Sequence, residues 1–277
     1  MKNLFCVVLL AAAGLCGSAY AAAYDDFARA LSAYNQGNIE AAIAGFSSAL
    51  ADGDLSVKLR PAAHIGRAKA YLRKSSCADA VTDLSAALAV QPRDATALVL
   101  RASAYSCVGK MADAETDVDA ALEIAPDATL YFDRGRLRWT RGQFSDAAAD
   151  FAQTTRLNPS WLYGALWLAD AERRSHAFDA KAFGKTLPDF SSREWPGPIL
   201  AYYLGERSSD DVYSAAARAD ASVKASQKCE ADYYIGEWQV AQGNAADGKR
   251  LLQSAADNCP HNFVEFTAAQ AELKRAP

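Results

Sequence analysis

The stretch NCPHNFVEF, residues 258–266, brings together three side chains that could bind a metal ion. Cys259, His261 and Glu265 lie within a few positions of one another. Thiolate, imidazole and carboxylate groups are all ligands of zinc, but structural zinc sites use recurrent spacings that this stretch does not match. We therefore predict no metal site here and expect the stretch to have a structural role.

Catalytic chemistry has few candidate residues in this sequence. The chain has 3 histidines, His64, His176 and His261, which are far apart. It contains no glycine-rich phosphate loop, no G-x-S-x-G elbow and no H-E-x-x-H helix. An active site needs a nucleophile, a base or a metal held in a pocket, so we predict neither enzymatic activity nor a cofactor.

The first 21 residues resemble a secretory signal peptide. Lys2 precedes an apolar run, residues 4–15, and an Ala-x-Ala site ends at Ala21. Cys16 suggests lipidation as an alternative, but the bulky Leu15 before it does not suit a lipoprotein cleavage site. We therefore expect cleavage after Ala21 and a periplasmic or secreted protein. We do not expect an outer-membrane lipoprotein, or membrane insertion once the signal is removed.

Composition then limits the kind of partner. Of the 277 residues, 51 % are hydrophobic and 22 % are charged, as in an ordinary globular protein. Without residues 1–21 the chain has 28 basic and 33 acidic side chains, 28 − 33 = −5. Nucleic-acid-binding domains normally carry a concentrated basic face, so we predict no nucleic-acid partner.

A repeat of about 34 residues organises the first half of the chain. Prolines end the similar phrases LAVQP, LEIAP and TRLNP at Pro92, Pro126 and Pro159, with spacings of 34 and 33 residues. Ala80, Ala114 and Ala147 have the same spacings. Three blocks in phase resemble the tetratricopeptide repeat, a helix–turn–helix unit. This resemblance implies an all-α, right-handed superhelical solenoid of such units.

Small residues recur where two helices of a unit must cross or turn. The predicted crossing positions on first helices are Ala68, Ala102 and Gly135. The predicted turns are at Gly37, Ser75, Gly109 and Gly142. An earlier block around Ala42 makes four units over residues 22–159. We expect irregular helical pairs over 160–227, and a final unit with a C-terminal capping helix over 228–277.

The capping helix is predicted from about residue 262 to 275. Phe263, Phe266 and Leu273 recur at helical spacing and would face the last unit. Glu265 and Glu272 would then lie on the opposite face, in solvent.

Four cysteines remain after the signal: Cys77, Cys107, Cys229 and Cys259. An even number in an exported protein indicates two disulfides, although three pairings are open. In stacked antiparallel helices, the ends that carry Cys77 and Cys107 should be neighbours, as should those of Cys229 and Cys259. We therefore favour these two pairings.

In tetratricopeptide proteins the first helices line a concave groove that holds a peptide or a partner's helix. The family pattern places eight residues of this chain there: Tyr34, Lys69, Arg73, Val99, Ser103, Phe132, Arg136 and Trp139. The cations and aromatic rings suggest that the groove binds an acidic or C-terminal peptide segment. In the alternative interpretation the arginines are solvated and the aromatic rings pack between units.

The C-terminal half resembles tetratricopeptide proteins of the NlpI type. The matching motifs are Trp195-Pro196, Tyr203-Leu204-Gly205, Tyr233-Tyr234-Ile235-Gly236 and the stretch from His261 to Glu265. The resemblance implies a bacterial cell-envelope adaptor that binds a periplasmic protease and its peptidoglycan hydrolase substrate, and that forms a homodimer. A second interpretation is a subunit of a secretion or pilus assembly machine, which uses similar repeats.

Overall fold

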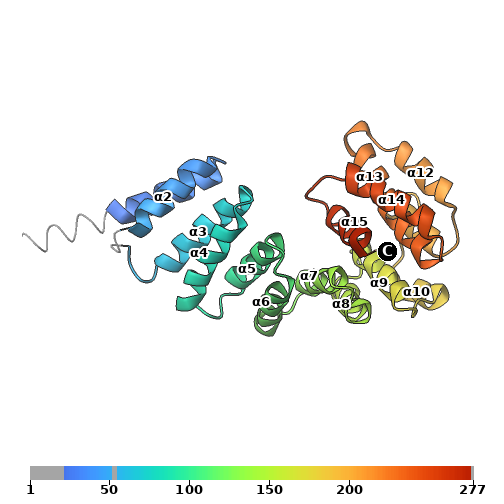
Figure 1. Ribbon diagram of the computed structural model, residues 1–277, viewed down its shortest axis with the longest axis horizontal. Helices are drawn as coiled ribbons and strands as arrows, with labels where there is room; N and C mark the ends of the chain where they lie inside the picture. The colour runs from blue at the N-terminus through green and yellow to red at the C-terminus, as the bar shows by residue number, and fades with distance from the viewer. Residues whose placement is uncertain (1–21, 52–54, 276–277) are drawn as a thin grey trace, which may run out of the picture. The chain divides into compact units, whose positions relative to one another are not determined.

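The computed structural model describes residues 22–51 and 55–275 (Figure 1). The predicted signal peptide, residues 1–21, lies outside this part of the chain. All regular structure in the described residues is helical, which confirms the all-α class. The chain divides into two compact units: unit 1 ends at Pro126 and unit 2 begins at Asp127.

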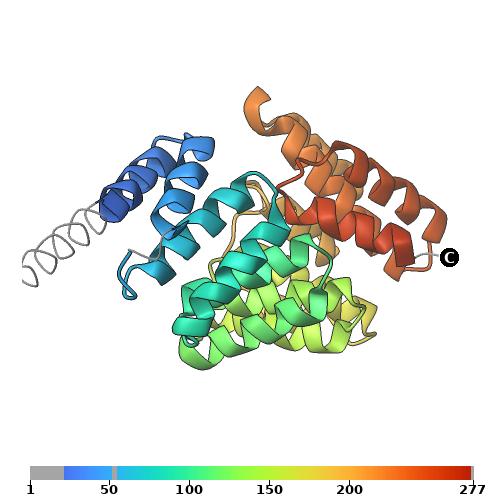
Figure 2. The same ribbon diagram turned by 60° about the vertical axis from the view of Figure 1, so that its left-hand side comes forward.

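Unit 1 is a series of helix pairs whose members are consecutive in the sequence (Figure 2). It comprises a helix over residues 22–35, α2 Ile39–Ala51, α3 Arg60–Arg73, α4 Cys77–Val90, α5 Ala95–Cys107 and α6 Met111–Ile124. Each of these helices packs on the next one, and the crossing points carry fully buried alanines such as Ala42, Ala80 and Ala114.

Two features of unit 1 explain why the recurring small residues are needed. A Cβ atom on Gly66 would lie 2.5 Å from the Phe46 ring, so α2 and α3 can approach only because this residue is glycine. Gly109 ends its helix with a φ of +79°, a conformation that costs other residues energy. Ser75 adopts the same region at the corresponding turn, with a φ of +59°.

Unit 2 begins with regular pairs and then becomes irregular. Its helices are α7 Ala128–Thr140, α8 Phe144–Leu157, α9 Leu162–Arg174, α10 Ala180–Thr186, α11 Gly197–Tyr203, α12 Ser209–Ala217, α13 Ala221–Ala241, α14 Ala245–Asn258 and α15 Val264–Arg275. The short α10 and α11 flank the Trp195–Pro196 segment, which contains a cis peptide bond. The long α13 begins before residue 228, where we placed the start of the final unit.

Large rings fill the core of unit 2. Trp167 contacts Phe132, Trp139, Phe151 and Tyr233, with ring centroids 5.5–5.8 Å apart. Such tilted and edge-on contacts add to the burial of large apolar surfaces.

The two predicted cysteine pairings are present. Cys77 at the start of α4 bonds to Cys107 at the end of α5, with Cα atoms 6.1 Å apart. Cys229 in α13 bonds to Cys259 just after α14, with Cα atoms 5.1 Å apart. The first disulfide lies within unit 1 and the second lies within unit 2.

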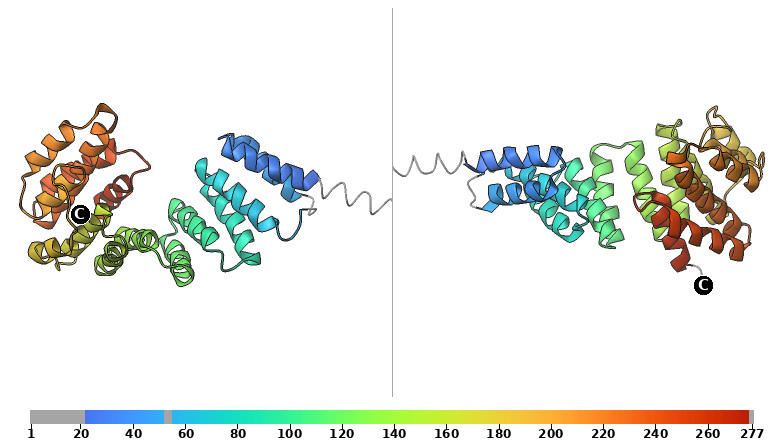
Figure 3. Two further views of the ribbon diagram at one scale, coloured as in Figure 1. Left: turned by 180° about the vertical axis from the view of Figure 1, so that it is seen from behind. Right: turned by 90° about the horizontal axis from the view of Figure 1, so that it is seen from above.

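The terminal helix α15 packs against α14, α13 and α7 (Figure 3). We predicted that Glu265 and Glu272 would face solvent, and this is wrong: each is only 3 % exposed. The buried stripe of α15 consists of Glu265, Ala268, Ala269 and Glu272. These residues follow the spacing i, i+3, i+4 and i+7, so they form one helical face. The buried face of α15 is the one that carries small residues, because alanines let α15 approach other helices closely.

Candidate functional site

The candidate site is the first-helix face of unit 1. In the repeat register, Leu31, Lys69 and Ser103 each follow a buried alanine of a first helix, so they occupy equivalent positions. We define the face by eight residues: Tyr24, Leu31, Ile65, Lys69, Leu72, Arg73, Val99 and Ser103. Every one of them is at least partly exposed, and Tyr24 and Leu31 are 50 % and 39 % exposed. Unit 1 therefore presents apolar side chains to solvent along its first helices.

Charge is separated between the two sets of helices in unit 1. The second helices α2, α4 and α6 contain acidic residues and no lysine or arginine. The first helix α3 contains Lys69 and three arginines, and α5 contains Arg101; neither has an acidic residue, whereas the helix over 22–35 has both kinds. The acidic residues of α6 are Asp113, Glu115, Asp117, Asp119 and Glu123. The first-helix side of α3 is therefore suited to a negatively charged ligand.

Some of these cations are used within the fold. Arg67 of α3 binds both carboxylate oxygens of Asp83 in α4 at 2.7 Å, and Arg101 of α5 binds Asp117 in α6 in the same way at 2.8 Å. Burial alone would raise the pKa of Asp83, but its bonds to Arg67 and His64 hold that pKa below its usual value. These pairs tie the first helix of a repeat to its second helix.

Sequence reasoning missed these pairs, although the sequence contains their signal. Arg67, Arg101 and Arg134 are spaced by 34 and 33 residues. Their partners Asp83, Asp117 and Asp150 have the same spacings. Arg134 in unit 2 binds Asp150 at 2.7 Å. A recurring arginine with an aspartate 16 positions later on the paired helix indicates a structural ion pair.

Other cations of α3 remain on the surface. Lys69 has no ion pair or hydrogen bond among the residues that the structure describes. Arg73 is exposed, and its guanidinium lies 5.5 Å from the centre of the Tyr34 ring. A third predicted groove residue, Ser103, is exposed on α5. Tyr34, Lys69, Arg73 and Ser103 thus all lie where a ligand could reach them.

The predicted groove residues of unit 2 lie differently. Phe132 is 4 % exposed and Trp139 is fully buried, because both belong to the ring cluster around Trp167. They pack between helices, which is the alternative interpretation of these rings. Arg136 is half-buried and pairs with Asp133 at 3.5 Å.

The helix α15 covers the first helices of unit 2. Arg275 donates hydrogen bonds of 2.9 Å to the carbonyl oxygens of Trp139 and Thr140 at the end of α7. Glu272 pairs with Arg174 of α9 at 2.8 Å. The α15 helix thus makes polar bonds to α7 and α9, in addition to its apolar contacts.

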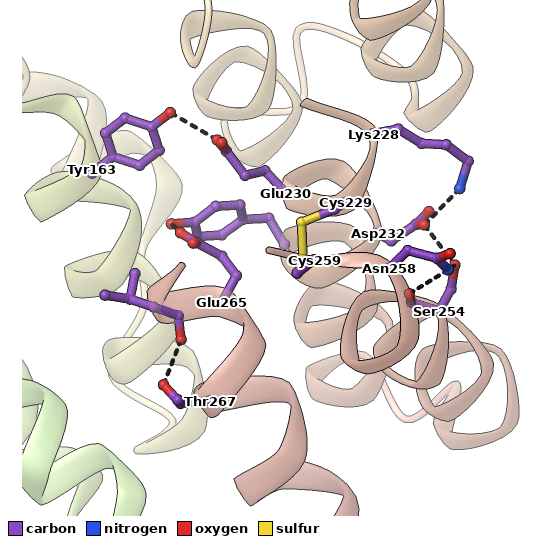
Figure 4. Close-up of a disulfide and its surroundings, with 12 residues drawn as sticks. Tyr163, Lys228, Cys229, Glu230, Asp232, Ser254, Asn258, Cys259, Glu265 and Thr267 are labelled. Atoms are coloured by element: carbon purple, nitrogen blue, oxygen red, sulfur yellow. Dashed lines mark hydrogen bonds and ion pairs between the residues drawn. A yellow bond between two sulfur atoms is a disulfide. The ribbon is translucent and has the colours of Figure 1, made fainter. Parts of the chain in front are cut away.

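Residues 258–266, which lead into α15, are also held by bonds to another helix of unit 2 (Figure 4). Glu265 accepts a 2.8 Å hydrogen bond from the hydroxyl of Tyr234 in α13. Cys259 is in the disulfide with Cys229, and the His261 ring stacks on Phe266. The stretch serves to attach α15. No group of three or more potential metal-binding side chains occurs within 22–51 and 55–275.

Unit 2 also buries ionisable groups near α15. Burial, together with the charge of the neighbouring Glu230, raises the pKa of Glu265 to about 7. Burial likewise raises the pKa values of Asp170 and Glu237 to about 7, against the effects of Arg173 and Arg174. The Arg173 guanidinium lies 3.7–4.1 Å from the ring centres of Phe178, Tyr203 and Trp238. Burial thus brings the pKa values of the Glu265, Asp170 and Glu237 carboxyls close to neutral pH.

Comparison with known proteins decides the family. The profile described as tetratricopeptide repeat matches residues 27–76, 65–129 and 132–182. The chain belongs to the tetratricopeptide repeat family. A tetratricopeptide repeat array is a scaffold for protein–protein interaction. None of its described helices is long and apolar enough to cross a membrane.

Solved structures share the fold of this tetratricopeptide repeat protein at low sequence identity. A tetratricopeptide repeat protein from Parabacteroides merdae has a TM-score of 0.62 and 17 % identity, over 90 % of this chain and 98 % of that one. The MamA protein has a TM-score of 0.55 and 16 % identity, over 60 % of this chain and 89 % of its own. The C-terminal part of a repeat protein from Cytophaga hutchinsonii has a TM-score of 0.53 and 14 % identity, over 89 % and 87 %.

Proposed function

We propose that this protein is an exported, non-enzymatic adaptor that binds an acidic segment of a partner protein on the first-helix face of unit 1. The observation that carries the proposal is the combination of exposed apolar side chains with the surface cations Lys69 and Arg73 of α3, a helix that has no acidic residue. Lys69 supplies a charge with no partner among the described residues, while α3 and α5 carry no acidic residue. An acidic segment would complete this surface.

The two kinds of contact contribute differently to binding. Exposed ion pairs contribute about 0.2–1 kcal/mol each and weaken as salt rises, so Lys69 and Arg73 mainly provide selectivity for acidic segments. Burial of apolar surface contributes roughly 25 cal/mol per Å², so Tyr24, Leu31 and their neighbours supply most of the affinity. We expect modest affinity that decreases with ionic strength.

The bacterial periplasm is the proposed location. The N-terminal sequence has the features of a cleavable signal, and disulfides such as Cys77–Cys107 persist in oxidising compartments. The likeness of the C-terminal half to NlpI-type proteins supports a role in linking a periplasmic protease to peptidoglycan hydrolases, as a homodimer.

Affinity capture from a periplasmic extract tests this proposal. The bait is the mature protein from Ala22 onward, beside its Lys69→Glu/Arg73→Glu variant. The Lys181→Glu/Lys185→Glu variant is the matched control, because it makes the same charge change on exposed residues of α10 in unit 2. We expect a protease or a hydrolase to be captured by the wild type and the control, and not by the unit 1 variant. Equal capture by all three baits would contradict the proposal.

A second candidate role is in pilus assembly or secretion. The structure of PilW, described as a type IV pilus biogenesis factor, has a TM-score of 0.50 and 16 % identity over 90 % of this chain and 98 % of its own. Capture of pilus or secretion components by the wild-type bait would favour this role over envelope proteolysis.

A further inference from the structure

A cavity of about 330 Å³ opens between four helices of unit 2. The start of α14 and the end of α15 form most of its lining, and the ends of α9 and α13 contribute one residue each. Ligand pockets in proteins typically have volumes of roughly 300–1,000 Å³. The cavity is therefore large enough for a small molecule, and none of its lining residues belongs to the unit 1 face.

The walls of this cavity are mainly apolar. Val240 of α13, Leu252 of α14 and Leu273 of α15 contribute aliphatic side chains. Ala245 and Ala246 at the start of α14 also line the cavity, and both are exposed, so these small side chains leave it open to solvent. An aliphatic chain that entered the cavity would remove apolar surface from water, which is favourable.

Three cations line the same cavity: Arg174, Lys249 and Arg275. Glu272 pairs with Arg174 at 2.8 Å and also pairs with Arg275. Glu237 pairs with Arg174 at 3.2 Å. Lys249 is exposed and has no ion pair or hydrogen bond among residues 22–51 and 55–275. Three cations against two carboxylates leave one positive charge unbalanced.

The two arginines are close enough to repel each other. Burial lowers the pKa of the Arg275 guanidinium, and the positive charge of Arg174 lowers it further. A ligand carboxylate beside them would offset this repulsion. A doubly charged anion is less suited, because Glu272 also lines the cavity and would repel the second negative charge.

We infer that this cavity binds an aliphatic monocarboxylate, with its carboxylate group beside Lys249 and the two arginines. Its hydrocarbon chain lies against Val240 and Leu252. The ligand is a free fatty acid of short to medium length. This site is separate from the unit 1 face, and it adds a small-molecule ligand to the proposed binding of a partner protein.

Isothermal titration calorimetry of the full mature chain, from Ala22 onward, tests the site with octanoate. Butanoate keeps the carboxylate and shortens the chain, whereas 1-octanol keeps the chain and removes the charge. Each buried CH₂ group strengthens binding roughly fourfold, so octanoate should bind at least about tenfold more tightly than butanoate. Octanoate should also bind about fivefold more tightly than octanol, which corresponds to the upper value for an exposed ion pair.

Two variants locate the site. Ala246→Phe places a ring in the cavity and should weaken octanoate binding at least tenfold. Its control is Ala112→Phe, because Ala112 is also exposed and is likewise the second residue of its helix, α6. Lys249→Glu should weaken octanoate binding at least fivefold. Lys181→Glu makes the same charge change on an exposed residue of α10 outside the cavity and should leave binding unchanged.

Three outcomes would overturn the inference. The first is no binding of octanoate to the wild-type protein. The second is octanoate binding that survives Ala246→Phe or Lys249→Glu, because the ligand would then lie elsewhere. The third is equal binding of octanoate and octanol, because the cavity would then not recognise a carboxylate. Urea denaturation checks that the variants keep the stability of the wild type, as expected for substitutions of exposed residues.

A last titration separates a fatty acid from the end of a polypeptide, which has the same chemistry when its last residue is aliphatic. The probe is N-acetylleucine, which carries a carboxylate and a branched aliphatic side chain. We expect it to bind more weakly than octanoate, because its aliphatic part is shorter. Tighter binding of N-acetylleucine would assign the cavity to a chain end and would overturn the fatty acid as its ligand.

Discussion

Unit 1 and unit 2 are built from the same helix pair but differ in what covers their first helices. Unit 1 packs on alanines such as Ala80 and Ala114 and leaves Tyr24 and Leu31 exposed. Unit 2 packs on large rings, and its own terminal helix α15 bonds across its first helices. One repeat framework can therefore present a surface to a partner in one region and bury the equivalent surface in another.

The largest expected effect concerns the ring cluster of unit 2. Trp167→Ala removes a fully buried ring, and we expect it to lower the free energy of unfolding by about 3–5 kcal/mol. Leu84→Ala, a fully buried residue of unit 1, is the matched truncation and should cost about 2–4 kcal/mol. Urea denaturation gives both values. In each variant, hydrogen exchange should show a loss of amide protection only within the unit that carries the mutation. A loss of protection in the other unit as well would show that the two units do not unfold separately.

Removal of a disulfide should have the next largest effect on the free energy of unfolding. Each disulfide closes a segment of 30 residues, one in each unit. Replacing either pair by serine should lower the free energy of unfolding by about 2–4 kcal/mol, because the unfolded chain gains conformational freedom. Urea denaturation measures the loss, and non-reducing peptide mapping of the wild type checks the pairing. Detection of a peptide with a Cys107–Cys229 bond would show that a disulfide links the two units, and would contradict the assignment of one disulfide to each unit.

A smaller effect should depend on pH and be confined to unit 2. Burial raises the pKa of Glu265 from 4.5 to about 7, so the folded protein binds a proton more tightly than the unfolded chain. The stabilising contribution is therefore complete below about pH 4.5 and is lost as pH rises through 7. We expect unit 2 to be less stable at pH 8 than at pH 5.5, with Glu265 contributing on the order of 1–2 kcal/mol.

Hydrogen exchange of residues 264–275 at the two pH values measures this effect. Glu265→Gln, which keeps the side-chain shape, should reduce the difference between pH 5.5 and pH 8. Asp170 and Glu237, with pKa values also raised to about 7 by burial, should contribute to the pH difference that remains. An unchanged pH difference in Glu265→Gln would mean that this carboxyl does not control the attachment of α15.

The smallest effect on stability should come from the unit 1 face. Lys69→Glu and Arg73→Glu change exposed side chains, so the free energy of unfolding should change by less than about 0.5 kcal/mol. Capture of the acidic partner should nevertheless fall, and its binding to the wild-type protein should weaken as salt is raised from 50 to roughly 300 mM because exposed charges are screened. A salt-independent affinity would show that apolar contacts alone hold the ligand.

The repeat and its turns could be predicted from the sequence because their causes are local. Proline ends a helix, glycine permits the turn, and alanine permits the crossing, so the residue type alone indicates the local structure at each of these positions. The cysteine pairings followed from the same helix order. The placement of Phe132 and Trp139 could not be fixed in this way, since it depends on α9, α13 and α15, which are distant in the sequence.

The terminal helix shows a second limit of sequence reasoning. Its bulky residues Phe263 and Phe266 favoured one face, whereas the structure buries the stripe of Glu265, Ala268, Ala269 and Glu272. Hydrophobic spacing assumes that a buried face is apolar. Here Tyr234 and Arg174 pair with the two glutamates, and these partners lie in other helices.

The two kinds of cross-link in unit 1 have different consequences for gene duplication. The Arg67–Asp83 and Arg101–Asp117 pairs each lie inside one repeat, so a copied repeat would carry its own pair. The Cys77–Cys107 bond joins the second helix of one repeat to the first helix of the next. A repeat inserted between them would separate the two cysteines. Once this bond had arisen, the number of repeats could change elsewhere in the array but not at this junction.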